Sequence, residues 1–160
     1  MGSGIAQIAA QNGSEVVLVD TAQEAVDKAK TGHQKILARL VEKERLKQGE
    51  DDEILARINY TINMDEIAGS DLVIEAIVED MNVKKKVFAR MEELCDENTI
   101  LASNTSSLSI ASIGSSVKKS DRVVGIHFFN PAPLMPLVCM LGNCTATSLA
   151  ERILLSKPLA

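Results

Sequence analysis

The two histidines of this sequence are the side chains whose ordinary pKa lies closest to neutral pH, and they stand in different settings. His127 begins the run His127-Phe-Phe-Asn-Pro131, directly after an apolar stretch. A lone histidine is more often a satisfied core residue than a base. At the end of an apolar run, with Asn130 close by, we interpret His127 as a general base. His33 lies within a helical pattern without such neighbours, and we expect it on the surface.

Acidic and hydroxyl side chains follow three other apolar stretches. Asp20 ends the run 15–20, and Glu79 follows the run 71–77. Ser106 belongs to Asn104-Thr-Ser-Ser107, which follows a third run. Carboxylates and hydroxyls can bind the hydroxyl groups of a ligand, and a hydroxyl beside a base can hold a substrate.

The elements that must position these side chains alternate along the chain. Continuous apolar runs of this length are typical of strands covered on both faces, as in a parallel sheet. Strands alternating with helices predict a doubly wound α/β fold with right-handed crossovers. We expect strands over 15–20, 71–77, 99–103 and 122–126, with an edge strand over 58–62.

Three helices are expected between the strands. The first covers 2–11, and a second covers 21–46, starting at a capping box formed by Thr21 and Glu24. The third has a buried stripe made of Val83, Val87, Met91 and Leu94. In such a fold the ligand binds beyond the carboxyl ends of the strands, where the polar side chains above gather.

The acid at the end of the first strand suggests the kind of ligand. In a dinucleotide-binding fold, a carboxylate at this place binds the ribose hydroxyls and repels a 2′-phosphate, which favours NAD over NADP. Asp20 follows the glycines by about the 20 residues that the fingerprint requires. The alternative is an acid that only complements a helix dipole. Gly2 fits the third glycine of an incomplete G-x-G-x-x-G fingerprint.

Charge and composition exclude several other classes of function. The net charge is −5 and the pI about 5.1, which argues against nucleic acid as a partner. The basic cluster Lys84–Lys86 is interpreted mainly as a solvated helix face. The cysteines are odd in number and fit no zinc pattern, so we expect no metal and a reducing compartment. The longest apolar run, 133–142, is too short to span a membrane.

Together these stretches resemble the NAD-binding domain of the 3-hydroxyacyl-CoA dehydrogenases. The resemblance runs from Met1 to about Val138, so we expect that domain over 1–138 and a divergent tail over 139–160. The runs Ser-Asn-Thr-Ser-Ser and His-Phe-Phe-Asn-Pro are its most specific parts. The stretches that carry it are 1–7, 16–20, 75–79, 102–108, 127–131 and 135–138.

The resemblance implies a Rossmann-like fold and a reaction in which NAD accepts a hydride from C3 of a 3-hydroxyacyl-CoA, giving a 3-oxoacyl-CoA. His127 would remove the hydroxyl proton, Ser106 would touch substrate and nicotinamide, and Asn130 would hold the nicotinamide region. The implied contacts to NAD come from Gly2, Asp20, Glu79, Lys84, Ser106 and Asn130. Lys43 and Ser106 would meet the CoA substrate.

Three departures from the family pattern are visible. The first strand and two glycines are missing before Met1, which would remove the pyrophosphate turn. Cys139 stands where the family has a glutamate that pairs with the catalytic histidine. The C-terminal helical domain, through which the family dimerises, is absent. We therefore expect a weakly active or inactive form.

Three interpretations stay open. The chain is a fragment of a family enzyme, or a non-catalytic remnant that binds a nucleotide or a partner, with a splice form or an altered reading frame as its origin. A hydroxy-acid dehydrogenase of another substrate class is disfavoured by the run at His127–Pro131. We expect a cytoplasmic location, or the mitochondrial matrix if a targeting segment preceded Met1.

Overall fold

The computed structural model describes residues 1–134 and 138–142, in which helices and parallel strands alternate. The chain divides into two compact units, one formed by Ser3–Glu66 and one by Met1–Gly2 with the residues from Ile67 onward. In chain order the elements are α1 (Gly2–Gln11), β1 (Val16–Val19), α2 (Gln23–Glu42), α3 (Glu50–Ala56), β2 (Ile58–Thr61), a 3₁₀ turn (Met64–Ile67), β3 (Leu72–Glu75), α4 (Met81–Leu94), β4 (Ile100–Ser103), α5 (Ile110–Gly114), a 3₁₀ turn (Ser120–Arg122), β5 (Val123–Phe128), a 3₁₀ turn (Ala132–Leu134) and β6 (Val138–Leu141).

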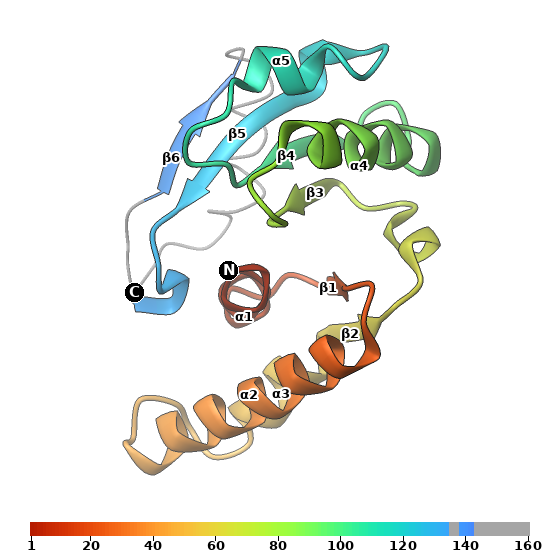
Figure 1. The fold of residues 1–160 in the computed structure, drawn as a ribbon. Coiled ribbons are helices and arrows are strands. Elements are labelled where there is room, and N and C mark those ends of the chain that lie inside the picture. The colour runs from red at the N-terminus through yellow and green to blue at the C-terminus, as the bar shows by residue number, and fades with distance from the viewer. Residues whose placement is uncertain (135–137, 143–160) are drawn as a thin grey trace. The chain divides into compact units, whose positions relative to one another are not determined.

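The unit Ser3–Glu66 is built on a two-stranded parallel sheet. β1 pairs with β2 in the register Val16 to Ile58, which confirms the predicted edge strand. Helices α2 and α3 lie side by side in this unit (Figure 1). Its buried core consists of Ala10, Leu37, Ile54 and Ile58.

The second unit contains a four-stranded sheet in the order β3-β4-β5-β6. The first three strands are parallel, and β6 runs antiparallel to β5. Helices α4 and α5 lie next to each other and pack on this sheet (Figure 1). The central strands are apolar and buried, as Leu101, Ala102 and Val124 illustrate. The α/β fold class with parallel strands is therefore confirmed.

Strands β1 and β3 each have a partner on one side only, as do β2 and β6 at the other edges of the two described sheets. Among the described residues, β1 pairs with β2 alone and β3 pairs with β4 alone. The described strands form two separate sheets, and β1 and β3 each present an unpaired edge. Backbone N–H and C=O groups along such an edge are available to another strand.

The predicted start of the second helix was wrong. Helix α2 begins at Gln23, and its N-cap Ala22 has extended backbone and no side-chain capping bond. Asp20 Oδ1 accepts a hydrogen bond from the Ala22 N–H at 3.2 Å, so the chain turns before any Thr21 cap forms. The helix also ends earlier than predicted, since Glu44 adopts a left-handed φ of 57°.

The predicted buried stripe of α4 was right at Met91 but one residue out of place at Val83 and Val87. The side chains that α4 buries are Lys84, Phe88 and Met91, whereas Val83 is 40% exposed. The apolar pattern could not show this because a lysine occupies a core position. Asp80 caps the helix by accepting hydrogen bonds from the N–H groups of Asn82 and Val83.

His33 is buried, so its predicted place on the surface was wrong. Only 1% of the residue is exposed, and Nδ1 lies 2.7 Å from Tyr60 Oη. Nε2 lies 2.8 Å from both the hydroxyl and the carbonyl oxygen of Ser3. Burial lowers the pKa of His33, and the Ser3 carbonyl opposes that change only in part. The partners lie far from His33 in sequence, which is why a helical pattern did not reveal them.

Strand β6 crosses the expected boundary between residues 138 and 139. The rest of the expected tail, 143–160, lies outside the described residues. No helix in the described part of the chain is long and apolar enough to cross a membrane. Within that same part, no group of three or more His, Cys, Asp or Glu side chains could hold a metal ion.

Candidate functional site

The carboxyl ends of β3, β4 and β5 meet at one edge of the four-stranded sheet. Glu75 is the register partner of Ser103, and Ser103 is the partner of Gly125. The segments that follow these strands therefore lie next to one another. The prediction that polar residues gather at this edge is confirmed for these three strands.

Glu79 joins the segment after β3 to the segment after β4. Its Oε1 accepts hydrogen bonds from the backbone N–H groups of Ser106 at 3.0 Å and Ser107 at 3.2 Å. The hydroxyls of Thr105 and Ser107 donate to the same oxygen. Burial opposes ionisation of this carboxyl group. The hydrogen bonds and the charge of Lys84 outweigh it and lower the pKa of Glu79 to about 2.

Lys84 lies beneath this edge rather than on a solvated face. Its ammonium group is 2.6 Å from Glu75 Oε1 and 3.4 Å from Glu79 Oε2, and the side chain is 1% exposed. Within the basic run Lys84–Lys86, Lys86 is exposed, whereas Lys84 is buried. The family resemblance could not distinguish a lysine that contacts a ligand from a buried lysine that forms ion pairs with neighbouring residues.

His127 lies within β5 and not after it, which corrects the predicted strand end. Its ring contacts Phe129 edge-on, with 5.1 Å between the ring centroids. Nδ1 is buried and has no hydrogen-bond partner among the described residues. The backbone of the next residue, Phe128, is held in place because its N–H donates to Asn104 Oδ1 at 2.8 Å. Strand β4 and strand β5 are thus tied together beside the histidine.

Cys139 of β6 is the register partner of His127. Directly opposed residues of an antiparallel pair point to the same face, with Cβ atoms about 4.5–5.5 Å apart. A thiol is a weak donor and a weak acceptor, so it does little to orient an imidazole or to stabilise its cation. Cys139 is exposed and its thiol is free.

The remaining expected contacts of this unit are exposed. Ser106 is exposed after β4, and Asn130 is exposed after β5, next to a cis peptide bond to Pro131. Gly2 is also exposed. A Cβ atom added to it would lie 3.8 Å from the Cβ of Ala76, which is ordinary contact. Close packing therefore does not require glycine at this position.

Two expected ligand contacts belong to the other unit. Asp20 lies exposed immediately after β1, and its carboxylate receives one backbone N–H, from Ala22. Lys43 is exposed at the C-cap of α2. Both side chains have the exposure that contact with a ligand requires.

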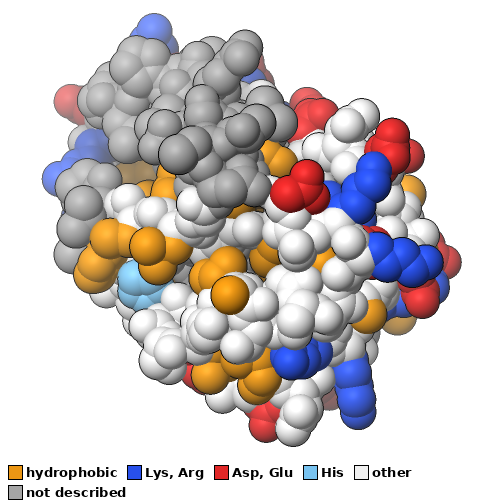
Figure 2. Space-filling view, turned by 90° about the horizontal axis from the view of Figure 1, so that it is seen from above, with side chains coloured by type: hydrophobic (Ala, Val, Ile, Leu, Met, Phe, Trp, Pro, Cys, Tyr) orange, Lys and Arg blue, Asp and Glu red, His pale blue; other side chains and the backbone are white. Residues whose placement is uncertain are grey.

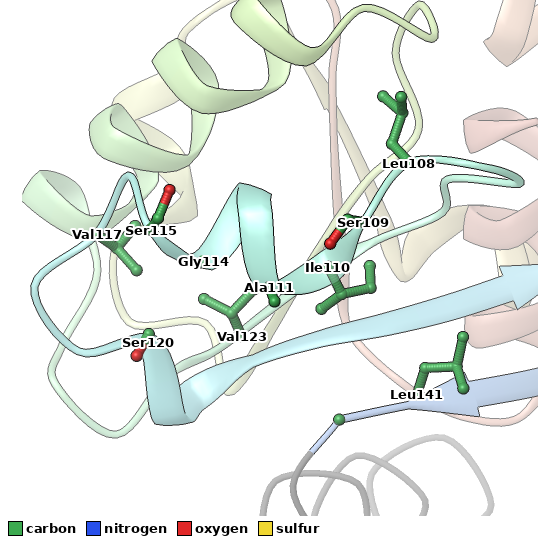
Figure 3. A pocket seen from close by; sticks show the side chains of 11 residues that line it. Leu108, Ser109, Ile110, Ala111, Gly114, Ser115, Val117, Ser120, Val123 and Leu141 are labelled. Atoms are coloured by element: carbon green, nitrogen blue, oxygen red, sulfur yellow. The ribbon is translucent and has the colours of Figure 1, made fainter.

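A cavity of about 660 Å³ lies elsewhere in the second unit (Figure 3). It is bounded by α5, by Val123 of β5 and by Leu141 of β6, and its lining is largely apolar. None of the expected site residues lines it. This cavity is therefore distinct from the edge that carries His127 and Ser106.

Comparison with known proteins decides the family. The sequence pattern of the 3-hydroxyacyl-CoA dehydrogenase NAD-binding domain matches residues 1–154. The chain belongs to this family. Its match extends past Val138, into the stretch that was expected to diverge.

Known dehydrogenases resemble the chain over most of its length. The 3-hydroxybutyryl-CoA dehydrogenase of Clostridioides difficile is 50% identical over 143 residues, which cover 89% of this chain and 51% of that protein. The human mitochondrial hydroxyacyl-coenzyme A dehydrogenase is 45% identical, covering 86% of this chain and 46% of that protein. The chain thus spans about half the length of these relatives.

Solved structures confirm the fold. The (S)-3-hydroxybutyryl-CoA dehydrogenase of Ralstonia eutropha superposes with a TM-score of 0.92 at 37% identity. The match covers 96% of this chain and 56% of that one. The 3-hydroxybutyryl-CoA dehydrogenase of Escherichia coli gives a TM-score of 0.91 at 38% identity, covering 96% of this chain and 34% of that one.

NAD is the cofactor of the matched domain, and the residues described here suit it. Asp20 offers a carboxylate at the end of a strand, which is the group that binds ribose hydroxyls. Ser106 is exposed at the sheet edge, on a segment that Glu79 holds. These donors and acceptors fit the hydroxyl and amide groups of a dinucleotide.

Sequence reasoning missed residues that support the exposed ones. Glu75 is buried within β3, and Asn104 binds the backbone of β5. The signal for Glu75 was present, because a carboxylate inside an apolar run requires a buried partner.

On the face shown in Figure 2, Lys and Arg side chains are interspersed with Asp and Glu rather than gathered into a basic patch.

Proposed function

We propose that this chain binds NAD and carries the catalytic base for oxidation of a 3-hydroxyacyl-CoA to a 3-oxoacyl-CoA. The observation that carries the proposal is the place of His127. It lies at the end of β5, beside the segment that presents Ser106, at the edge where parallel sheets bind ligands. The family to which the chain belongs supports the same reaction.

His127 would act through Nε2. Its Nδ1 is buried, so only the other ring nitrogen can meet a substrate hydroxyl. NAD, when bound, would supply the acceptor for the hydride that leaves C3 of the substrate. His127 takes the hydroxyl proton, and C3 becomes a carbonyl carbon while the ring becomes an imidazolium ion. The proton then leaves to solvent.

The exposed polar residues would orient the reacting groups. We assign Ser106 to the substrate and the nicotinamide, and Asn130 to the nicotinamide region. Asp20 would bind the adenosine ribose, and Gly2 would contact the pyrophosphate. Lys43 meets the CoA phosphates as a positive charge. Glu79 would serve the cofactor by holding the Ser106 segment, and Lys84 would do so through its ion pair with Glu79.

The proposed activity of the bare chain is weak. Nothing among the described residues stabilises the imidazolium at Nδ1, since Cys139 supplies a thiol. The relatives are about twice as long, and the rest of their length would hold the acyl-CoA and form the dimer. Positioning a substrate can supply about 7–11 kcal/mol of a barrier, so its loss should matter more than the thiol.

A second candidate is a nucleotide-binding or partner-binding protein without catalysis. The unpaired edges of β1 and β3 in the described sheets favour it, because an edge strand can pair with another chain. As for location, free Cys95 and Cys139 suit a reducing compartment, and we propose the cytoplasm, with the mitochondrial matrix as the alternative.

Titration of the chain with NADH, followed by the fluorescence of NADH itself, tests the proposal. We expect weak but saturable binding that is tighter than binding of NADPH. The full reaction is tested with NAD and 3-hydroxybutyryl-CoA, where we expect turnover near background. Absence of any binding of either dinucleotide would contradict the proposed function.

A further inference from the structure

A buried carboxylate in β3 has no role in the reaction proposed above. Glu75 is 4% exposed and occupies the last position of an otherwise apolar strand. Burying a charge is costly unless it is paired and hydrogen-bonded. A carboxylate retained here must therefore have complete compensation around it.

Three elements supply that compensation. Lys84 of α4 places its ammonium 2.6 Å from Glu75 Oε1, and the N–H of Ile77 donates to the same oxygen at 2.8 Å. The hydroxyl of Ser103, at the end of β4, donates to Oε2 at 2.8 Å. Glu75 thus binds its own loop, the neighbouring helix and the neighbouring strand at once.

The same buried ammonium also contacts a partly exposed carboxylate. Lys84 lies 3.4 Å from Oε2 of Glu79, whose side chain is 39% exposed. The other oxygen of Glu79 binds the backbone of Ser106 and Ser107. A continuous series of contacts therefore leads from Glu75 through Lys84 and Glu79 to the segment that presents Ser106.

We propose that Glu75 is a positioning residue for the dinucleotide, acting through Lys84 and Glu79 on the Ser106 segment. The inference rests on the proposed function and deepens it. If the negative charge of Glu75 were removed, the ammonium of Lys84 would pair with Glu79 alone. The carboxylate of Glu79 would then turn from Ser106 and Ser107 towards the ammonium.

Stability alone does not account for this arrangement. Replacing a buried ion pair by neutral groups of similar volume is often neutral or stabilising. The geometry of the bonds is more specific, since each oxygen of Glu75 faces a different element. We therefore infer that the network keeps the loops that it connects in a fixed conformation.

The first test is Glu75→Gln in the full chain, with Glu93→Gln as a matched control. Glu93 is an exposed acid of α4 outside this network. We expect Glu75→Gln to weaken NADH binding about tenfold, in line with loss of one charge-assisted bond, and the control to leave it unchanged. Amide hydrogen exchange at Ser106 and Ser107 should accelerate in Glu75→Gln and not in Glu93→Gln.

The second test asks whether Glu75 acts through Lys84. Lys84→Met should weaken NADH binding, and adding Glu75→Gln to it should weaken binding no further. Independent, additive losses would overturn the route through Lys84. Where Lys84→Met does not fold, Ser103→Ala replaces it, since it removes one bond of the network and should give a smaller change in the same direction.

Two outcomes separate this inference from the proposed function. A Glu75→Gln variant that binds NADH with parental affinity and exchanges Ser106 and Ser107 at parental rates overturns the positioning role, whatever its melting temperature. If the parent chain binds no NADH, the proposed function fails. The exchange rates alone then decide: faster exchange supports the positioning role, and unchanged exchange overturns it.

Discussion

His127 of β5 and Cys139 of β6 are directly opposed across an antiparallel strand pair. Their side chains point to the same face of the sheet, and Nδ1 of the histidine is buried without a partner in the described structure. A thiol thus occupies the position from which a carboxylate could orient the imidazole of His127. We therefore expect this pair to limit the ability of His127 to accept a proton.

Replacing Cys139 by glutamate should not restore the reaction by itself. A carboxylate would orient His127 and stabilise its cation, but the substrate would still lack most of its binding surface. We expect Cys139→Glu to raise NADH formation from 3-hydroxybutyryl-CoA less than about tenfold, out of the roughly 10²–10⁴ that general-base catalysis contributes. Cys139→Gln, similar in size and uncharged, is the control. Robust turnover by the parent chain would contradict this account.

Asp20 should decide the choice between NADH and NADPH. Asp20→Ser removes the carboxylate that repels a 2′-phosphate, so the two dinucleotides should bind within about threefold of each other. Asp27→Ser, on exposed α2, is the control and should leave the preference intact. Fluorescence titrations measure both. A parent chain that binds NADPH as tightly as NADH would show that Asp20 has no such role.

Stability should fall on mild acidification because of His33. Burial lowers its pKa, so below about pH 6.5 the unfolded chain binds a proton that the folded chain does not. Stability is therefore complete above the ordinary pKa and decreases as the pH falls towards the lowered one. We expect the Tm to drop between pH 7 and pH 5.5 in the parent and to drop by less in His33→Gln. Equal pH profiles would contradict the role of His33.

The unpaired edges of β1 and β3 should make the isolated chain associate. Backbone groups left without partners cost about 1–3 kcal/mol each when buried, against a total stability of about 5–15 kcal/mol for a domain. We expect concentration-dependent association in analytical ultracentrifugation and a broad thermal transition. A sharp, cooperative melt of a strict monomer would show that these edges are satisfied in another way.

The sequence predicted the strands well because each is a continuous apolar run, as β4 and β5 illustrate. It predicted Asp20 and the Ser106 segment after strands because polar residues after apolar runs are a local signal, but it ended β5 before His127, which lies within that strand. It could not place His33 or Lys84, whose burial depends on partners distant in the chain. Tyr60 and Glu75 become neighbours of these residues only in the folded units.

The strand that opposes Cys139 to His127 was not predicted, although the resemblance implied that residue 139 pairs with the histidine. The prediction stopped at Val138, since the stretch that follows resembled nothing known. Strand β6 forms there because backbone pairing with β5 does not require a recognisable pattern of side chains. The predicted capping box at Thr21 does not form for a related reason, because Asp20 accepts a hydrogen bond from the Ala22 N–H before the helix begins.

The central claim is that His127 is the catalytic base, and a chimera tests it most directly. Residues 1–138 would replace the matching part of the 3-hydroxybutyryl-CoA dehydrogenase of Clostridioides difficile, which supplies the rest of its own length. The rate of NADH formation from 3-hydroxybutyryl-CoA is then compared with that of the same chimera carrying His127→Ala. We predict clear turnover by the first and a loss of at least about 100-fold in the second. Equal rates in the two proteins would contradict the claim.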